Sequence, residues 1–177
     1  MRLDKTQRSV VGGMASAVLV VVLVFLAASQ VTFFNSETRD LWYRLNTAAL
    51  SSLLPTLTLF ICIARLANHR FLTPEDIQGS AQTSGTIKAR VLQSLLQNTL
   101  EQGSLALPVY AAVSLFAPGR LLALVPAAAA MFVIGRVLFF IGYPKGAPSR
   151  AFGFALTFYP TVLLSLIGVI VGLSSVV

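Results

Sequence analysis

Charged residues are scarce in this chain, and the scarcity excludes most soluble folds. Only 11% of its 177 residues are Asp, Glu, Lys or Arg, whereas soluble domains carry about 25%. Hydrophobic residues make up 56% of the chain, and the mean hydropathy is +0.81. We therefore predict an all-α integral membrane protein, because several apolar runs reach the length of about 20 residues that a spanning helix needs.

Cysteine and histidine occur once each, which narrows the redox and metal chemistry open to the chain. Cys62 can form no disulfide within one chain. Because it lies in an apolar run, we expect it to be buried and to pack like a small hydrophobic residue. His69 alone excludes a multi-histidine metal site within one subunit. A Gly-x-Ser-x-Gly elbow is also missing, so nothing indicates a hydrolase. No metal site is predicted.

Acidic residues are few as well: six, against 13 Lys and Arg, for a net charge of +7. In a soluble protein such an excess indicates nucleic acid as the partner. Here the basic residues flank apolar runs, which is typical of membrane proteins with positively charged cytoplasmic loops. The expected partner is therefore the lipid bilayer and not nucleic acid.

Five apolar segments lie along the chain, at residues 10–32, 41–68, 86–116, 121–143 and 150–173. The first has a signal peptide as its alternative interpretation. Its apolar core of about 20 residues exceeds the roughly 7–15 of a signal peptide, which favours an uncleaved helix. The distribution of Lys and Arg places the N-terminus in the cytoplasm. Five spans then place the C-terminus in the periplasm, if the membrane is a bacterial inner membrane.

The third segment is the most polar of the five. Ser94, Asn98 and Glu101 recur at i, i+4 and i+7, so they share one helical face. A stripe with a hydroxyl, an amide and a carboxylate is buried against other helices or a cavity. Two interpretations stay open: the stripe only joins helices, or it also binds a ligand.

Two arginines mark the fourth segment and the turn after it. Arg136 lies within an apolar run, where a charge costs about 2.5–3.5 kcal/mol on insertion scales. We expect it to pair with Glu101, since each would otherwise be an uncompensated buried charge. Arg150 follows the turn. With Lys145 and Arg65 it forms either a cationic pocket at the cytoplasmic rim or an ordinary positive-inside cluster.

Three stretches, taken in order, resemble the MAPEG superfamily, the membrane-associated proteins of eicosanoid and glutathione metabolism. They are RLANHRFLTPEDIQGS at 65–80, the Asn-x-x-Glu pattern of Asn98 and Glu101, and GRVLFFIGY with APSRAF between 135 and 152. The resemblance covers residues 51–173 and is to members like the microsomal glutathione transferases and prostaglandin E synthases. It implies a homotrimer whose subunit is a four-helix transmembrane bundle. Residues 41–177 would form that bundle, after an extra transmembrane helix and loop at residues 1–40.

The resemblance also implies an activity and a site. Family members bind glutathione between neighbouring subunits, and many are transferases, peroxidases or isomerases of lipophilic substrates. The matching glutathione contacts in this chain are Arg65, Asn98, Glu101, Tyr143 and Arg150. Arg150 corresponds to the catalytic residue that stabilises the thiolate. The chemistry needs a cation there, because a thiol with a pKa of about 8.5 is mostly protonated at neutral pH.

The sequence departs from the family's pattern at several of these places. It has Ser94 and Gln97 where arginines are common, Phe139 for a histidine, Ala151 for a serine and Phe154 for a tyrosine. Two functions therefore compete. One is a glutathione-dependent transferase or peroxidase, and the other is a non-catalytic lipid-binding or scaffold protein, as in one branch of the family. A small transporter or channel would explain the buried charges but not the loop and turn motifs.

Overall fold

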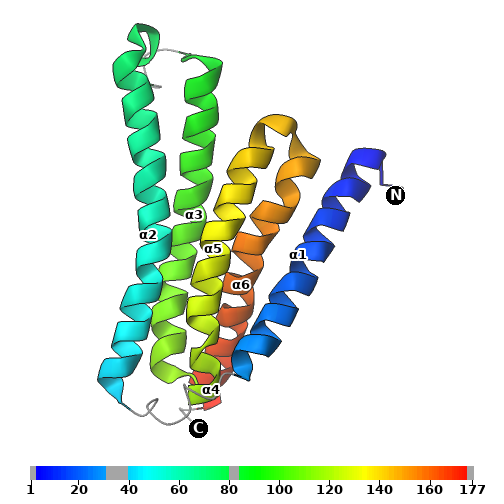
Figure 1. Ribbon diagram of the computed structural model, residues 1–177, viewed down its shortest axis with the longest axis vertical. Coiled ribbons are helices and arrows are strands. Elements are labelled where there is room, and N and C mark those ends of the chain that lie inside the picture. Colours follow the sequence, from blue (N-terminus) through cyan, green and yellow to red (C-terminus); the bar gives the residue numbers. More distant parts are fainter. Residues whose placement is uncertain (1–2, 31–39, 80–83, 175–177) are drawn as a thin grey trace.

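The computed structural model describes residues 3–30, 40–79 and 84–174, and within these ranges the regular structure is entirely helical. Five long helices and three short helical turns follow one another along the chain (Figure 1). They are α1 (Lys5–Ser29), α2 (Leu41–Leu72), η2 (Pro74–Asp76), α3 (Ile87–Phe116), α4 (Gly119–Leu122), α5 (Leu124–Gly142), η3 (Tyr143–Lys145) and α6 (Ala147–Ser174). The predicted all-α class is confirmed.

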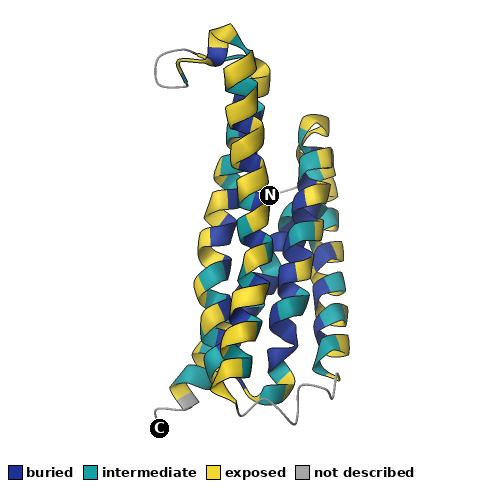
Figure 2. Ribbon diagram, turned by 60° about the vertical axis from the view of Figure 1, so that its left-hand side comes forward, coloured by how far each residue is buried: buried dark blue, intermediate teal, exposed yellow. Residues whose placement is uncertain are grey.

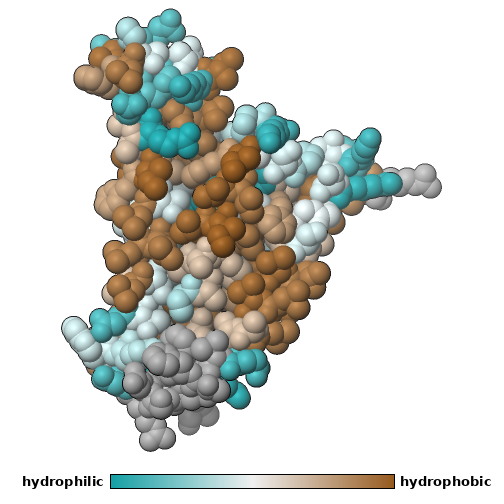
Figure 3. All heavy atoms as spheres, viewed as in Figure 1, coloured by the Kyte–Doolittle hydropathy of each residue, from teal (hydrophilic) through white to brown (hydrophobic). Residues whose placement is uncertain are grey.

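The protein is an integral membrane protein. Four helical stretches of the described chain are long and apolar enough to span a bilayer: Lys5–Ser29, Leu41–Leu72, Gly119–Lys145 and Ala147–Leu173. Helix α3, with 30 residues, is long enough to span a bilayer but is more polar than these four stretches. It packs against α2, α5 and α6. Hydrophobic side chains cover the middle of the molecule, whereas hydrophilic ones gather toward its ends (Figure 3).

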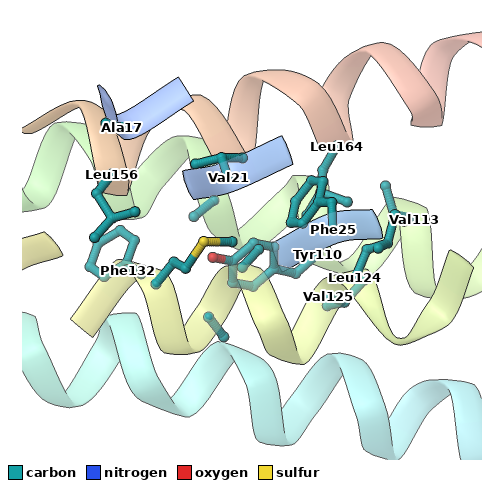
Figure 4. Close-up of a cluster of buried hydrophobic side chains, with 14 of the residues drawn as sticks. Ala17, Val21, Phe25, Tyr110, Val113, Leu124, Val125, Phe132, Leu156 and Leu164 are labelled. Carbon is teal, nitrogen blue, oxygen red and sulfur yellow. The ribbon is translucent and has the colours of Figure 1, made fainter. Parts of the chain in front are cut away.

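Helix α1 packs along α6 at one edge of the bundle, opposite α2 (Figure 1). It begins at a capping box in which Asp4 accepts from the Gln7 amide at 2.6 Å. Its buried residues are Ala17, Val21 and Phe25, spaced by four, and the rest of the helix is largely exposed (Figure 2). Figure 4 shows these three beside Leu156 and Leu164 of α6. The extra helix is therefore part of the bundle core.

Glycines let α5 and α6 approach closely. A Cβ on Gly153 of α6 would collide with the backbone amide of Phe139 and lie 2.8 Å from the carbonyl oxygen of Gly135. Gly142 of α5 faces the backbone of Ser149 in the same way. Small residues at such contacts let membrane helices pack through their backbones, and here they fix the α5–α6 hairpin that carries one wall of the site.

We expect Gly153→Val to lower the melting temperature of the detergent-solubilised protein by several degrees. Overpacking of this kind costs about 1–3 kcal/mol, and backbone atoms cannot move aside as a side chain can. The control is Gly172→Val on the same helix, where an added Cβ meets nothing within 4 Å. Equal melting temperatures for the two variants would contradict the role given to Gly153.

Candidate functional site

A cavity of about 510 Å³ lies between α3 and the α5–α6 hairpin. Toward this end of the bundle α2 and α3 extend beyond the other helices (Figure 1). One wall comes from α3, and the other from α5, η3 and α6. Four of the five residues predicted to contact glutathione line it. The full lining is Gln93, Ser94, Gln97, Asn98, Glu101, Phe139, Tyr143, Arg150 and Phe154.

Arg150 rests on an aromatic wall of this cavity. Its guanidinium carbon lies 4.4 Å from the centroid of the Tyr143 ring, a cation–π contact that orients the side chain. Phe139 meets Tyr143 edge-on at 5.4 Å, and Phe154 packs beside Phe139 at 6.3 Å. The turn at residues 143–146 brings Tyr143 and Arg150 together, because α5 ends and α6 begins there. The result is a half-buried cation next to apolar rings.

Helix α3 supplies the polar wall. Its exposed Glu101 accepts a hydrogen bond from the Gln97 side chain at 3.0 Å, one turn earlier. Asn98 lies deeper on the same wall and is half-buried. One carboxylate (Glu101), three amides (Gln93, Gln97 and Asn98) and one cation (Arg150) therefore line a single volume. Such a set can hold a zwitterionic ligand with an ammonium and a carboxylate group.

Arg136 lies behind the cavity and is completely buried. Its Nη1 donates to Asn98 Oδ1 at 2.7 Å, and its Nε donates to Thr157 Oγ1 at 3.1 Å. The guanidinium also sits 4.4 Å from the centroid of Phe139. Among the described residues its Nη2 has no hydrogen-bond partner. Arg136 thus ties together α3, α5 and α6.

The predicted pair of Arg136 with Glu101 is corrected by this geometry. Among the described side chains, those that accept from the Arg136 guanidinium are Asn98 and Thr157, and Glu101 is not one of them. Asn98 accepts from the guanidinium instead, because it faces inward toward α5, whereas Glu101 is exposed and bonded to Gln97. The spacing in the sequence placed Asn98 and Glu101 on one stripe of the helix, but it could not show which of the two faces α5.

Arg65 lies outside the main cavity of the same chain. It lines a separate cavity of about 370 Å³ between α2 and α3, lined by Arg65, Asn68, His69, Leu72, Thr73, Lys88 and Leu92. Lys145 is exposed in η3. The predicted cationic rim of Arg65, Lys145 and Arg150 is therefore not assembled within one copy, since Arg65 and Arg150 belong to different cavities.

Two departures from the family's pattern have different structural meanings. Ala151 is buried, and its Cβ lies 3.4 Å from where a Cβ on Gly13 of α1 would be. A small residue at position 151 therefore fits the contact with the extra helix. Phe154 is different, because its ring lines the cavity beside Phe139. Only the second change removes a hydroxyl from the cavity wall.

A buried carboxylate that the sequence analysis did not single out holds the α2–α3 connection. Asp76 is 2% exposed, and it accepts from the Thr86 amide at 2.7 Å and the Thr86 hydroxyl at 2.6 Å. His69, in the last turn of α2, places Nε2 3.0 Å from the same carboxylate. The hydrogen bonds from Thr86, with His69 nearby, hold the pKa of Asp76 below its usual range. The Pro-Glu-Asp sequence was the available signal.

We expect Asp76→Asn to lower the melting temperature at neutral pH and to have less effect in acid. The folded-state pKa of Asp76 lies below its unfolded value of about 3.9. Its stabilisation is therefore complete above about pH 4 and is lost as the pH falls through the folded-state pKa. Circular dichroism melting curves across this range measure the difference, with exposed Glu75→Gln as the control. A difference that does not change with pH would contradict this role.

Comparison with known proteins gives one match. The MAPEG family model matches residues 45–170, which include α3, α5 and nearly all of α2 and α6 but leave out α1. No curated protein and no solved structure matches the chain significantly. Among the described residues, no group of three or more His, Cys, Asp or Glu side chains could hold a metal ion.

Proposed function

Because the chain belongs to the MAPEG family, we propose that it is a membrane-embedded glutathione-dependent transferase or peroxidase acting on lipophilic substrates. The observation that carries the proposal is the convergence of Asn98, Glu101, Tyr143 and Arg150 on one cavity. These residues come from three helical elements and are separated by up to 52 positions in sequence, from Asn98 to Arg150. Polar residues that only flanked or joined membrane helices would have no reason to line the same cavity.

Arg150 would activate the thiol by charge. A free thiol has a pKa of about 8.5, so at neutral pH only a few per cent is the nucleophilic thiolate. A guanidinium within hydrogen-bond distance favours the thiolate and stays charged itself. The thiol proton passes to solvent, and the sulfur then forms a bond to the electrophilic carbon while the leaving group departs with its electron pair. The aromatic rings of Phe139 and Phe154 offer an apolar surface for that substrate.

The position of Arg65 supports a site shared between subunits. Arg65 is exposed and lies on a different cavity from Arg150 in the same chain. In a homotrimer, Arg65 of one subunit would complete the cavity of its neighbour. Helix α1 packs on α6, away from the outer face of α2 that bears Arg65, and so leaves that face open for assembly.

The charge distribution supports a cytoplasmic location for the cavity. Most described basic residues lie at the end of the bundle with the α2–α3 and α5–α6 connections: Lys5, Arg8, Arg65, Arg70, Lys88, Arg90, Lys145 and Arg150. At the other end Arg44 caps α3 by donating to the carbonyls of Ser114, Leu115 and Ala117. By the positive-inside rule the N-terminus is then cytoplasmic and the C-terminus periplasmic in a bacterial inner membrane.

Purified protein should conjugate glutathione to a chlorodinitrobenzene-type electrophile and should melt at a higher temperature with glutathione present. The measurements are turnover in detergent or nanodiscs and a thermal shift. Cysteine alone at the same concentration is the control, because it carries the thiol without the tripeptide. Neither turnover nor a thermal shift would contradict the proposal.

A lipid-binding protein is the second candidate, and one observation favours it. An apolar groove of about 370 Å³ runs between α3 and α6 at the end away from Arg150. Its lining is Pro108, Val109, Ala112, Val113, Phe116, Leu164, Ser165, Gly168, Val169 and Gly172. Co-purified lipid without any thiol-dependent activity would favour this function. Glutathione conjugation that is lost in Arg150→Ala would exclude it as the sole function.

A further inference from the structure

A second cavity, of about 280 Å³, adjoins the first at the α2–α3 end of the bundle. The two volumes share Gln93 and Ser94 as lining residues, so they meet along one stretch of α3. We propose that the second cavity binds the glycyl carboxylate of glutathione through Arg70 and Arg90. This inference rests on the proposed function, because it assigns one end of the same ligand.

The second cavity is cationic. Arg70 at the end of α2 and Arg90 at the start of α3 both line it, and Arg70 donates to Gln93 Oε1 at 3.1 Å. The one carboxylate among its described lining residues, Asp76, is buried and already accepts from Thr86. Two guanidinium groups therefore face the volume, and guanidinium is the side-chain group best suited to a planar carboxylate.

The first cavity does not supply enough positive charge for this ligand. Among the lining residues that the structure describes, Arg150 is the one cation, and Glu101 is an opposing carboxylate. Glutathione carries two carboxylates, one ammonium group and a thiol. Its γ-glutamyl end is zwitterionic and suits the Glu101 region, whereas its glycyl end is a carboxylate alone. Ser94 and Gln97 are uncharged, so the next guanidinium group along α3 is that of Arg90, which lines the second cavity together with Arg70 of α2.

The spacing along α3 fits a tripeptide. Arg90, Ser94 and Asn98 recur every four residues and so lie on one stripe of the helix. Arg90 and Glu101 are eleven residues apart, which is about 16 Å along the helix axis at 1.5 Å per residue. Three extended residues span roughly 10 Å, and the long side chains of Arg90 and Glu101 close the remainder. The cysteinyl thiol, between the two ends of the ligand, would then lie in the first cavity, which Arg150 lines.

Binding constants for glutathione and its glycyl ethyl ester test this assignment. The ester keeps the thiol and the γ-glutamyl group and lacks only the carboxylate in question. We expect wild-type protein to bind glutathione about tenfold more tightly than the ester, which corresponds to roughly 1.4 kcal/mol. The double variant Arg70→Gln/Arg90→Gln should lose this preference because it binds glutathione as weakly as the ester.

Arg8→Gln is the charge-matched control. Arg8 is an exposed guanidinium near the N-terminus of α1, and neither of the two cavities includes it in its lining. This variant should keep the wild-type preference. A double variant that folds, melts like wild type and still prefers glutathione tenfold would overturn the assignment. Equal binding of both ligands by wild type would overturn it too, while leaving the proposed function intact. Wild-type protein that binds neither ligand would overturn both.

Discussion

Arg150→Ala is expected to lower kcat/KM for glutathione conjugation by about a hundredfold at neutral pH. Removal of one preorganised group that stabilises developing or formed negative charge costs about 10²–10³ in rate. The loss should shrink as the pH rises above about 8.5, because glutathione then ionises without help. Wild-type activity should depend less on pH in the same range. The measurement is kcat/KM against pH with a saturating electrophile.

Two variants separate charge from stacking at this position. Arg150→Lys keeps a positive charge but loses the planar group that lies over Tyr143. We expect its activity to fall between those of wild type and Arg150→Ala. Tyr143→Phe keeps the ring beneath the guanidinium and should retain most of the activity if the ring acts by orienting Arg150. Parallel pH profiles for wild type and Arg150→Ala would contradict thiol activation by this residue.

Asn98→Leu is expected to destabilise the folded protein by about 1.5–3 kcal/mol, the range for hydrogen bonds to charged groups. The leucine would leave Nη1 of Arg136 without its acceptor at a site where the guanidinium is fully buried. A buried charge that loses its partner keeps its desolvation cost. Unfolding of the detergent-solubilised protein by heat or denaturant measures the loss.

The control for this prediction makes the same chemical change on the same helix. Gln97→Leu also replaces an amide by leucine, but Gln97 is exposed and its partner Glu101 is exposed as well. We expect little change in stability for Gln97→Leu. Asn98→Asp should retain the contact, now as an ion pair with Arg136. Equal melting temperatures for Asn98→Leu and Gln97→Leu would show that Arg136 does not depend on Asn98.

Hydropathy and proline positions were enough to predict the helices. The predicted segment at 86–116 coincides with α3 almost residue for residue, because Thr86 caps the helix and Pro118 follows its end. The second segment was predicted to end at residue 68, but α2 continues to Leu72. The polar residues His69 and Arg70 hid this last turn, since they lie past the apolar run and find partners in Asp76 and Gln93.

Pair contacts were harder to predict than helices. The stripe on α3 was evident from spacing, yet spacing alone could not distinguish Asn98 from Glu101 as the acceptor for Arg136. That choice depends on how α3 is rotated against α5, which tertiary packing sets. The contact between Gly13 and Ala151 was also invisible in the sequence, because nothing there says which helix α1 packs against. The second cavity likewise exists only once α2 and α3 are placed side by side.

The ionisation of bound glutathione tests the central claim most directly. Thiolate absorbs at longer ultraviolet wavelengths and more strongly than thiol, so a pH titration of glutathione bound to concentrated protein gives the pKa of its sulfur. We predict that the bound thiol titrates well below about 8.5 in wild-type protein and near 8.5 in Arg150→Ala. A wild-type complex whose thiol titrates at the value of free glutathione would contradict the claim that Arg150 stabilises the thiolate.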